Sequence, residues 1–525
     1  MVSLHWDDRF VQQLPGDTDR SSRRRQVRKA VWAHAAPTPV AAPRVLAWSA
    51  EVADMLGLTE DEVTSQTFAD AFGGNALLPG MTPRATCYGG HQFGNWAGQL
   101  GDGRAMTLGE VQTPAGHLEL QLKGAGPTPF SRGGDGRAVL RSSIREFLCS
   151  EAMHHLGIPT TRALCLIGTG DDVLRDMFYD GHAAMEPGAI VCRVAPSFLR
   201  PGHFQIHARR GDTETLRTLV AYTLKHHFPE IWAAEQEATP AACVRLLDEV
   251  VRRHATLVAH WMRVGFVHGV LNTDNLSILG LTVDYGPYGW LEPWDLDWTP
   301  NTTDAGMGRY RFGWQPDVVG WNLTRFAEAL LPIVGEAAPL EAVLESYETR
   351  WLAAHGQMVA GKLGLRGFEV SDKDLWDDLS GALSAFEVDM TVFFRHLSGV
   401  PLGEGTEVDR VAAVAEAFYA EPFPTERARL SAWLDRYAAR VRSDAMETAD
   451  RTALMHRHNP KYVLRNYLAQ EAIDLATVGD LSRVHTLLEV MRRPYDEQPE
   501  HAIFAAKRPE WARHRAGCSQ LSCSS

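Results

Sequence analysis

The fold is decided by one stretch, His268-Gly-Val-Leu-Asn-Thr-Asp274-Asn275-Leu-Ser-Ile-Leu-Gly-Leu-Thr-Val-Asp284-Tyr285-Gly286. Its apolar residues between positions 276 and 283 predict short buried strand segments. Asp274, Asn275 and Asp284 flank these segments, where a loop aims their side chains. Carboxylate and amide oxygens suit a hard cation such as Mg²⁺, which is usually shared with substrate phosphates. The stretch therefore predicts a phosphate-transfer site, and a β-hairpin with Asn and Asp in its turn is the alternative.

The same stretch keeps the frame of the protein-kinase catalytic loop, His-Arg-Asp-Leu-x-x-x-Asn, which is followed by Asp-Phe-Gly. His268 takes the His position, Asn275 the Asn position, and Asp284-Tyr285-Gly286 the Asp-Phe-Gly position. Val270 stands where kinases carry the catalytic Asp, and a valine accepts no proton. Asp274 is the nearby carboxylate that could replace it.

Length, composition and net charge limit the classes of protein to which the chain can belong. The chain has 525 residues, 45% of them hydrophobic, and a net charge of -13, which predicts two or three globular lobes and argues against a general nucleic-acid binder. Residues 1–10 hold no apolar core typical of a secretory signal, and no apolar run reaches the length of about 18 residues that a membrane helix needs. We expect a cytoplasmic monomer with no nucleic-acid or membrane partner. Cysteines within apolar surroundings are expected to be reduced core thiols.

The glycine-rich segment from Tyr88 to Arg104 is the second informative stretch. Glycine lets backbone N–H groups approach a phosphate closely, so we expect a loop that cradles an anion, with Gly101, Gly103 and Arg104 at its end. The alternating segments that follow, residues 105–111 and 117–123, predict paired strands, the second ending at Lys123.

A further turn at Asp135 and Gly136 precedes an amphipathic helix predicted over residues 139–156. Glu146 on this helix would pair with Lys123 if it faces inward, and a solvated side chain is the alternative. The order of Gly-rich loop, strand Lys and helix Glu is that of a kinase small lobe. Arg193 and Arg200 would make bidentate phosphate contacts if they converge, and two unrelated surface charges are the alternative.

Together these elements predict an α+β, protein-kinase-like two-lobed fold with an N-terminal extension and a helical C-terminal region. The predicted division is an extension over residues 1–80, with a helical pattern over 45–72, a small lobe over 81–200, a mostly helical large lobe over 201–485 and a tail over 486–525.

The motifs also resemble those of the selenoprotein O family. The matching stretches are Ala-Pro-Thr-Pro-Val at 36–40, Tyr-Gly-Gly-His-Gln-Phe-Gly at 88–94, Leu-Lys-Gly-Ala-Gly-Pro-Thr-Pro-Phe-Ser-Arg at 122–132, Asp-Gly-Arg-Ala-Val-Leu-Arg-Ser-Ser-Ile-Arg-Glu from 135, His-Gly-Val-Leu-Asn-Thr-Asp-Asn from 268, and Asn-Pro-Lys-Tyr-Val-Leu-Arg-Asn-Tyr-Leu from 459. Each motif alone is weak, but together they are specific and span nearly the whole chain.

The resemblance implies a protein adenylyltransferase with a kinase-like fold. It would bind ATP inverted relative to kinases, transfer AMP to a Ser, Thr or Tyr hydroxyl of a protein, the enzyme itself included, and release pyrophosphate. The family pattern assigns the terminal phosphates to Lys123, paired with Glu146, and to Arg193 and Arg200. It places Gly101, Gly103, Arg104, Asp135 and Gly136 along the nucleotide, Asn275 and Asp284 on Mg²⁺ or alternatively Mn²⁺, and Asp274 as the general base.

Two other functions compete with this interpretation. An ordinary kinase would transfer the γ-phosphate, and Val270 argues against it. A catalytically inactive nucleotide-binding scaffold need not keep Lys123, Glu146, Asn275 and Asp284 together.

The chain departs from the family in its cysteines. The stretch Thr299-Pro300-Asn301 lacks the cysteine to which some members link their C-terminus. The tail carries Cys518 and Cys523, with cysteine where other members carry selenocysteine; either this pair has its own redox chemistry or the thiols are inert in a disordered tail.

Overall fold

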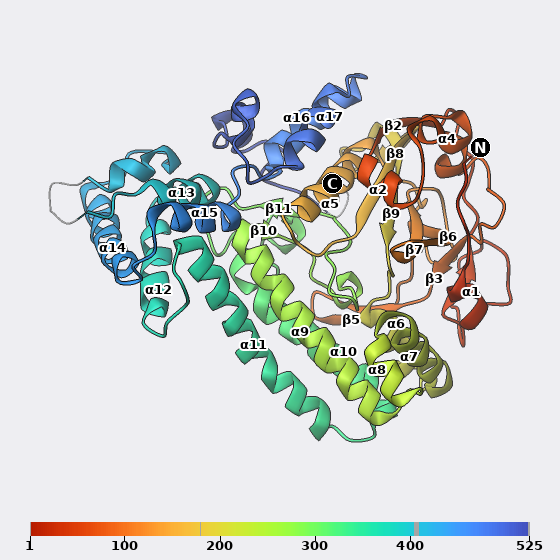
Figure 1. The fold of residues 1–525 in the computed structure, drawn as a ribbon. Helices are drawn as coiled ribbons and strands as arrows, with labels where there is room; N and C mark the ends of the chain where they lie inside the picture. Colours follow the sequence, from red (N-terminus) through yellow and green to blue (C-terminus); the bar gives the residue numbers. More distant parts are fainter. Residues whose placement is uncertain (1, 179, 404–408, 523–525) are drawn as a thin grey trace.

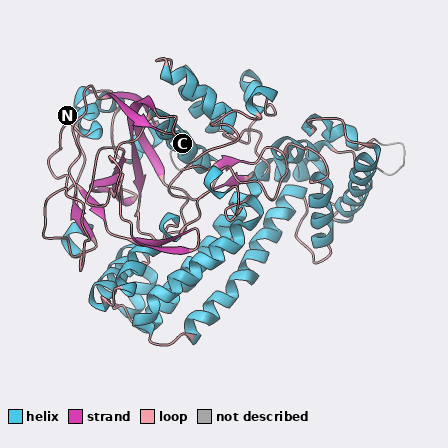
Figure 2. Cartoon of the chain, turned by 180° about the vertical axis from the view of Figure 1, so that it is seen from behind, coloured by secondary structure: helices cyan, strands magenta, loops and turns pink. Residues whose placement is uncertain are grey.

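The computed structural model describes residues 2–178, 180–403 and 409–522. It combines a seven-stranded antiparallel sheet with many helices, which confirms the α+β class. Figure 1 shows the sheet on one side of the molecule and the long helices α9, α10 and α11 beside one another below it. The same arrangement is seen from behind in Figure 2. The kinase-like division into lobes and its boundaries stay predictions.

Helices precede, separate and follow the strands of the sheet along the chain. They are α1 (Arg9–Gln13), α2 (Ala50–Met55), α3 (Glu60–Val63), α4 (Gln66–Gly73), α5 (Leu140–His155), α6 (Pro201–Arg209), α7 (Thr213–His227), α8 (Pro229–Glu235), α9 (Pro240–Val264), α10 (Gln315–Val334), α11 (Ala338–Leu363), α12 (Asp372–Leu383), α13 (Met390–His396), α14 (Pro424–Ser443), α15 (Thr448–His458), α16 (Asn466–Thr477) and α17 (Ser482–Met491).

The sheet has the strand order β1-β3-β6-β7-β9-β8-β2. Its strands are β1 (Trp32–His34), β2 (Arg44–Trp48), β3 (Arg84–Thr86), β6 (Ala105–Thr113), β7 (Gly116–Lys123), β8 (Arg162–Arg175) and β9 (Ala184–Ala195). The predicted pairing of residues 105–111 with 117–123 is confirmed. Both edge strands, β1 and β2, come from the N-terminal 80 residues, so this segment is part of the sheet.

Alternation along the strands sorts the side chains between two cores. On β7, Leu120 and Leu122 enter the core on the face that helices α2 and α4 cover. Gln121 and Lys123 therefore point to the opposite face, where α5 packs on β8 and β9. Because of this alternation, the Lys123 side chain lies on the same face of the sheet as helix α5, which carries Glu146.

Helix α9 leads the chain into the decisive stretch. Thr239 caps its start by accepting a hydrogen bond from the Ala242 N–H at 3.0 Å, and Pro240 occupies the first turn. The helix ends at Gly265, whose φ of +77° a residue with a side chain rarely adopts. Two-residue strand β10 (Phe266–Val267) follows and pairs with β11 (Gly289–Trp290), so residues 268–288 form one long loop.

Three local predictions were wrong. Residues 276–283 form no strand ladder; a 3₁₀ turn, η1 (Thr273–Asn275), and a single bridge from Thr282 to Thr160 hold the loop instead. Residues 45–48 lie in strand β2 rather than in a helix, because the neighbouring strand β8 supplies their hydrogen-bond partners. The segment from Tyr88 to Arg104 is mostly a hairpin, β4 (Gly89–Gln92) with β5 (Asn95–Gln99), and not an open loop.

The described part of the tail, up to residue 522, is packed and not disordered. Cys518 is buried in the large core, and the Leu521 backbone exchanges hydrogen bonds of 2.9 and 2.8 Å with Pro300 and Thr302. The tail thus reaches the segment at Thr299 without a disulfide. Cys523 lies outside the described residues. In the part of the chain that the structure describes, no helix is long and apolar enough to cross a membrane.

Candidate active site

One cavity of about 830 Å³ gathers nearly all the predicted site residues. It is lined by Gly101, Gly103, Arg104, Lys123, Asp135, Gly136, Arg193, Arg200, Asp274, Asn275 and Asp284, with Val270 among them. Glu146 lies behind Lys123 and is buried. Residues up to 183 positions apart therefore share one site, from Gly101 to Asp284.

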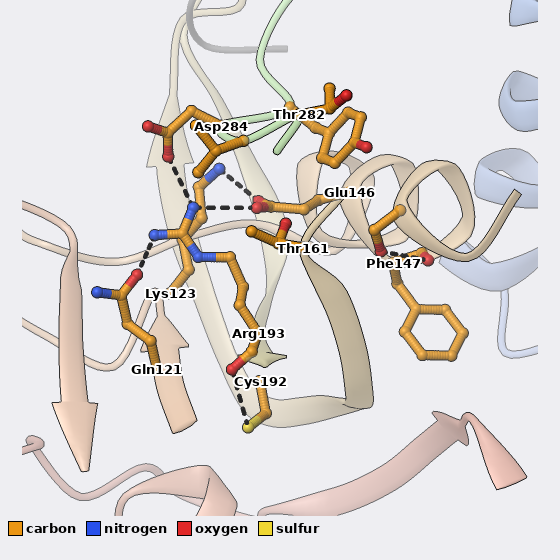
Figure 3. A network of polar contacts seen from close by, with 12 residues as sticks. Gln121, Lys123, Glu146, Phe147, Thr161, Cys192, Arg193, Thr282 and Asp284 are labelled. Carbon is orange, nitrogen blue, oxygen red and sulfur yellow. Dashed lines mark hydrogen bonds and ion pairs between the residues drawn. The ribbon is translucent and has the colours of Figure 1, made fainter. Parts of the chain in front are cut away.

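Strand register builds the cationic end of the site, as Figure 3 shows. Gln121 on β7 lies opposite Arg193 on β9, and their side chains are hydrogen-bonded. Lys123, two residues on, forms an ion pair with Glu146 of α5, and Glu146 also accepts a bond of 3.2 Å from Arg193. Glu146 therefore faces inward, and the alternative of a solvated side chain is wrong.

Arg193 and Arg200 converge on one carboxylate. Arg193 lies 2.7 Å from one oxygen of Asp284, and Arg200 lies 2.8 Å from the other. Both guanidinium groups are buried. The alternative of two unrelated surface charges is therefore wrong, and the pair forms a ready site for anionic oxygen atoms.

The two acidic side chains have opposite protonation tendencies. Burial raises the pKa of Asp284, but Arg200, Arg193 and Lys123 outweigh it, so the pKa is lowered. Burial raises the pKa of Asp274 to about 6. The hydrogen bond from Gln92 and the positive charge of Arg200 lower this pKa, but they offset the effect of burial only in part. Burial also lowers the pKa of Lys123, against the pull of Glu146. Unequal carboxylates in one cavity suit one permanent anion and one proton acceptor.

The loop that carries these groups is tied to the rest of the fold at both ends. His268 is buried, and its ring Nε2 lies 2.9 Å from the Val283 carbonyl. The Thr161 N–H donates to the Thr282 carbonyl at 3.1 Å, which joins the loop to the start of β8. Asp284 then has φ of +63°, a left-handed conformation that Asp tolerates better than most residues. The turn aims its carboxylate at the arginines.

Hairpin β4–β5, which we call the clamp hairpin, holds the loop of residues 268–288. The His91 N–H donates to the Thr273 hydroxyl at 2.7 Å, and the Phe93 N–H donates to the Asn272 side chain at 3.2 Å. Gly90 is required for the close approach, because a Cβ there would lie 2.7 Å from Asp274 Oδ1. Gly90 therefore lets the hairpin backbone lie directly against the Asp274 side chain.

Gln92 is a site residue that the sequence analysis missed. Its amide donates to Asp274 Oδ2 at 3.0 Å. The other oxygen of Asp274 is buried and has no hydrogen-bond partner among the described residues. Gln92 thus holds the carboxylate by one oxygen and leaves the second one for another group. The available signal was its position two residues after Gly90 in the motif at 88–94, but no spacing rule connects it to Asp274.

Arg175 is a second residue that was missed. It lies near the end of β8 and holds the Asp135 carboxylate through two bonds of 2.7 and 2.8 Å. Arg175 lines the same cavity. The predicted nucleotide-binding turn at Asp135 and Gly136 is thereby attached to the sheet.

A family model described as "Protein adenylyltransferase SelO" matches residues 20–492. The chain belongs to this family. A protein nucleotidyltransferase YdiU of Xanthomonas campestris pv. campestris (strain 8004) is 58% identical over 530 residues, and the match covers 100% of both chains. Relatives with the same description from Xanthomonas oryzae pv. oryzae (strain MAFF 311018) and Azoarcus sp. (strain BH72) are 57% and 56% identical, again over 100% of both chains. This SelO-family chain is therefore a nucleotidyltransferase, as its motifs predicted.

Proposed function

We propose that this SelO-family enzyme transfers AMP from ATP to Ser, Thr or Tyr hydroxyls of proteins and releases pyrophosphate. One observation carries the proposal: Asp274 shares a cavity with the buried Arg193 and Arg200 and the partly buried Lys123. One buried oxygen of this carboxylate has no hydrogen-bond partner among the described residues. A kinase-like frame with inverted ATP accounts for this arrangement, because it turns the α-phosphate and not the γ-phosphate toward the acceptor.

The cations would bind the terminal phosphates. Lys123 is kept charged and oriented by Glu146, while Arg193 and Arg200 offer guanidinium groups that suit bidentate contacts. They would also spread the negative charge that develops on the departing pyrophosphate, the main catalytic contribution of fixed charges in a buried site. Gly101, Gly103, Arg104, Asp135 and Gly136 are then left to contact the rest of the nucleotide.

Asn275 and Asp284 would hold Mg²⁺, with Mn²⁺ as the alternative. The Asn275 amide nitrogen donates to the Val270 carbonyl at 2.8 Å, which leaves its side-chain oxygen as the available ligand atom. Asp284 now neutralises two arginines. Since triphosphate oxygens would compete for the same guanidinium groups, nucleotide binding would release the carboxylate. The donor set fits a hard cation, which when bound supplies charge neutralisation for the phosphates.

Asp274 would act as the general base. Its free oxygen would accept the proton of the acceptor hydroxyl while the hydroxyl oxygen attacks the α-phosphorus. The P–O bond to the pyrophosphate then breaks, pyrophosphate leaves, and AMP stays on the acceptor. A positioned base contributes typically about 10²–10⁴-fold to a rate. Val270, which lines the cavity where a kinase carries its catalytic Asp, takes no part in proton transfer.

The test is to incubate the purified protein with Mg²⁺ and with ATP labelled in parallel at the α- or the γ-phosphate, and to count the label on protein. Label from the α-phosphate without label from the γ-phosphate is the expected result. The Asp274→Asn variant serves as the control for enzyme-dependent transfer. Label from the γ-phosphate alone would show that the protein is a kinase. ATP binding without transfer of either label would favour the catalytically inactive nucleotide-binding scaffold.

A further inference from the structure

A patch of arginine and tryptophan side chains lies beside the clamp hairpin, outside the cavity. We call it the basic–aromatic surface and define it by Arg209, Arg309, Arg325, Trp96 and Trp321. The guanidinium groups of Arg309 and Arg325 lie 4.7 and 5.1 Å from the centre of the Trp321 ring. Arg209 lies 5.6 Å from the centre of the Trp96 ring. The indoles hold the cations in place, because a guanidinium over an aromatic face is attracted to it.

The positive charge of this surface is mostly uncompensated. Among the described residues, the guanidinium groups of Arg209 and Arg309 have no carboxylate within 4.0 Å, although the Arg309 backbone N–H donates to Asp304, and the Arg325 guanidinium pairs only with Glu328, at 2.8 Å. Such a cluster is unusual in a chain with a net charge of -13. The pKa of the neighbouring His91 is lowered to about 4, first by burial and then by the positive charges of Arg209 and Arg325.

The hairpin connects this surface directly to the proposed base. The His91 ring lies 5.1 Å from Trp96 and 5.5 Å from Trp321, centre to centre, and so joins the two indoles. Gln92, the next residue, is bonded to Asp274. At the turn, a Cβ on Gly94 would lie 3.6 Å from the Arg309 guanidinium carbon. One short hairpin thus contacts both the base and the cations.

We infer that the basic–aromatic surface binds an acidic polypeptide segment, so that Asp or Glu side chains a few residues from the acceptor hydroxyl contact Arg209, Arg309 and Arg325. The inference rests on the proposed function and adds a substrate class to it. Charge complementarity selects an acidic partner, and the position beside Asp274 favours a substrate protein over other polyanions. The indoles add flat apolar area for the peptide backbone and side chains, as at other interfaces.

The experiment uses the full chain with Mg²⁺, α-labelled ATP and three matched peptides. Each peptide carries one serine, one threonine and one tyrosine, flanked by aspartates, by asparagines or by lysines. The enzyme forms are the wild type, the double variant Arg209→Gln/Arg309→Gln, the single variant Arg309→Glu, and Arg493→Gln as a control on an exposed arginine far along the sequence. KM and kcat for each peptide, ATP affinity and the thermal midpoint are measured for every form.

The wild type should prefer the aspartate-flanked peptide, with a preference that falls as salt rises. Since one exposed ion pair changes an equilibrium roughly two- to fivefold, the double variant should raise KM for that peptide roughly 4- to 25-fold. Its kcat, ATP affinity and thermal midpoint should stay close to those of Arg493→Gln. Arg309→Glu should improve use of the lysine-flanked peptide, a gain that a folding defect does not produce.

Equal use of the aspartate and asparagine peptides by the wild type, or an unchanged KM in the double variant, would overturn the docking inference and leave the proposed function standing. Transfer to none of the peptides and to no protein would remove the proposed function itself. A third result would also overturn the inference: if the double variant loses affinity for single-stranded RNA while its peptide kinetics are unchanged, the surface binds nucleic acid.

Discussion

Replacing Gln92 by Ala removes the one side-chain hydrogen bond that the described residues donate to the Asp274 carboxylate. The Gln92 amide donates to Asp274 Oδ2 at 3.0 Å, while Oδ1 has no partner among the described residues. A hydrogen bond to a charged group contributes about 1.5–3 kcal/mol. If that free energy serves only to hold the base, kcat falls roughly ten- to a hundredfold, since about 1.4 kcal/mol is a factor of ten. The loss stays within the factor that a general base supplies.

The assay is transfer of α-label to protein under saturating ATP, together with ATP affinity by calorimetry. ATP affinity should change little, because in the described part of the chain the Gln92 side chain is hydrogen-bonded to Asp274 and to none of the cations that line the cavity. Gln112→Ala on β6 is the matched control, since that glutamine is exposed. Gln92→Glu should be more damaging than Gln92→Ala, because a second carboxylate would face Asp274. A kcat of Gln92→Ala equal to that of the control would refute the reasoning, as would a loss of ATP affinity as large as the loss of rate.

Three further predictions concern the site and the sheet. Asp274→Ala should keep ATP affinity and lose transfer by about 10²–10⁴-fold; labelling at the wild-type level would exclude it as the base. Lys123→Ala should weaken both ATP binding and transfer, because it also leaves buried Glu146 short of a cation; unchanged calorimetric affinity would contradict this. Burial raises the pKa of Glu119 to about 7. The folded state then binds more protons than the unfolded state between about pH 4.5 and 7, so stability falls as pH rises through that window. Glu119→Gln should flatten this fall in thermal-midpoint scans, and an unchanged slope would contradict the assignment.

Periodicity made the elements around Lys123 predictable. The alternating segments 105–111 and 117–123 became β6 and β7, and the helical spacing over 139–156 became α5. Periodicity left open whether Glu146 faces inward, and the family resemblance implied its pairing with Lys123; in the structure the two side chains form an ion pair. The arginine pair was predicted only as a possibility among others, since nothing in a spacing of seven residues requires convergence.

The wrong predictions share a physical cause. Leu276, Ile278 and Val283 are buried although they belong to the loop, and an apolar run alone does not distinguish a strand from a buried loop. The helical pattern over 45–72 included β2, because pairing with β8 outweighs local preference. The glycines after Tyr88 were expected to approach a phosphate, whereas Gly90 approaches Asp274. Glycine signals a close approach without naming the partner.

Motifs and local periodicity are properties of neighbouring residues, so they were enough to identify the family, the α+β class and the residue types of the site. What those residues contact depends on how distant segments pack together. Strand register set Arg193 opposite Gln121, and the clamp hairpin brought Gln92 to Asp274. Packing left the guanidinium groups of Arg209 and Arg309 without carboxylate partners among the described residues. Such contacts join positions up to 182 residues apart, as for Gln92 and Asp274. Their free energy depends on distance in space, which no local pattern encodes.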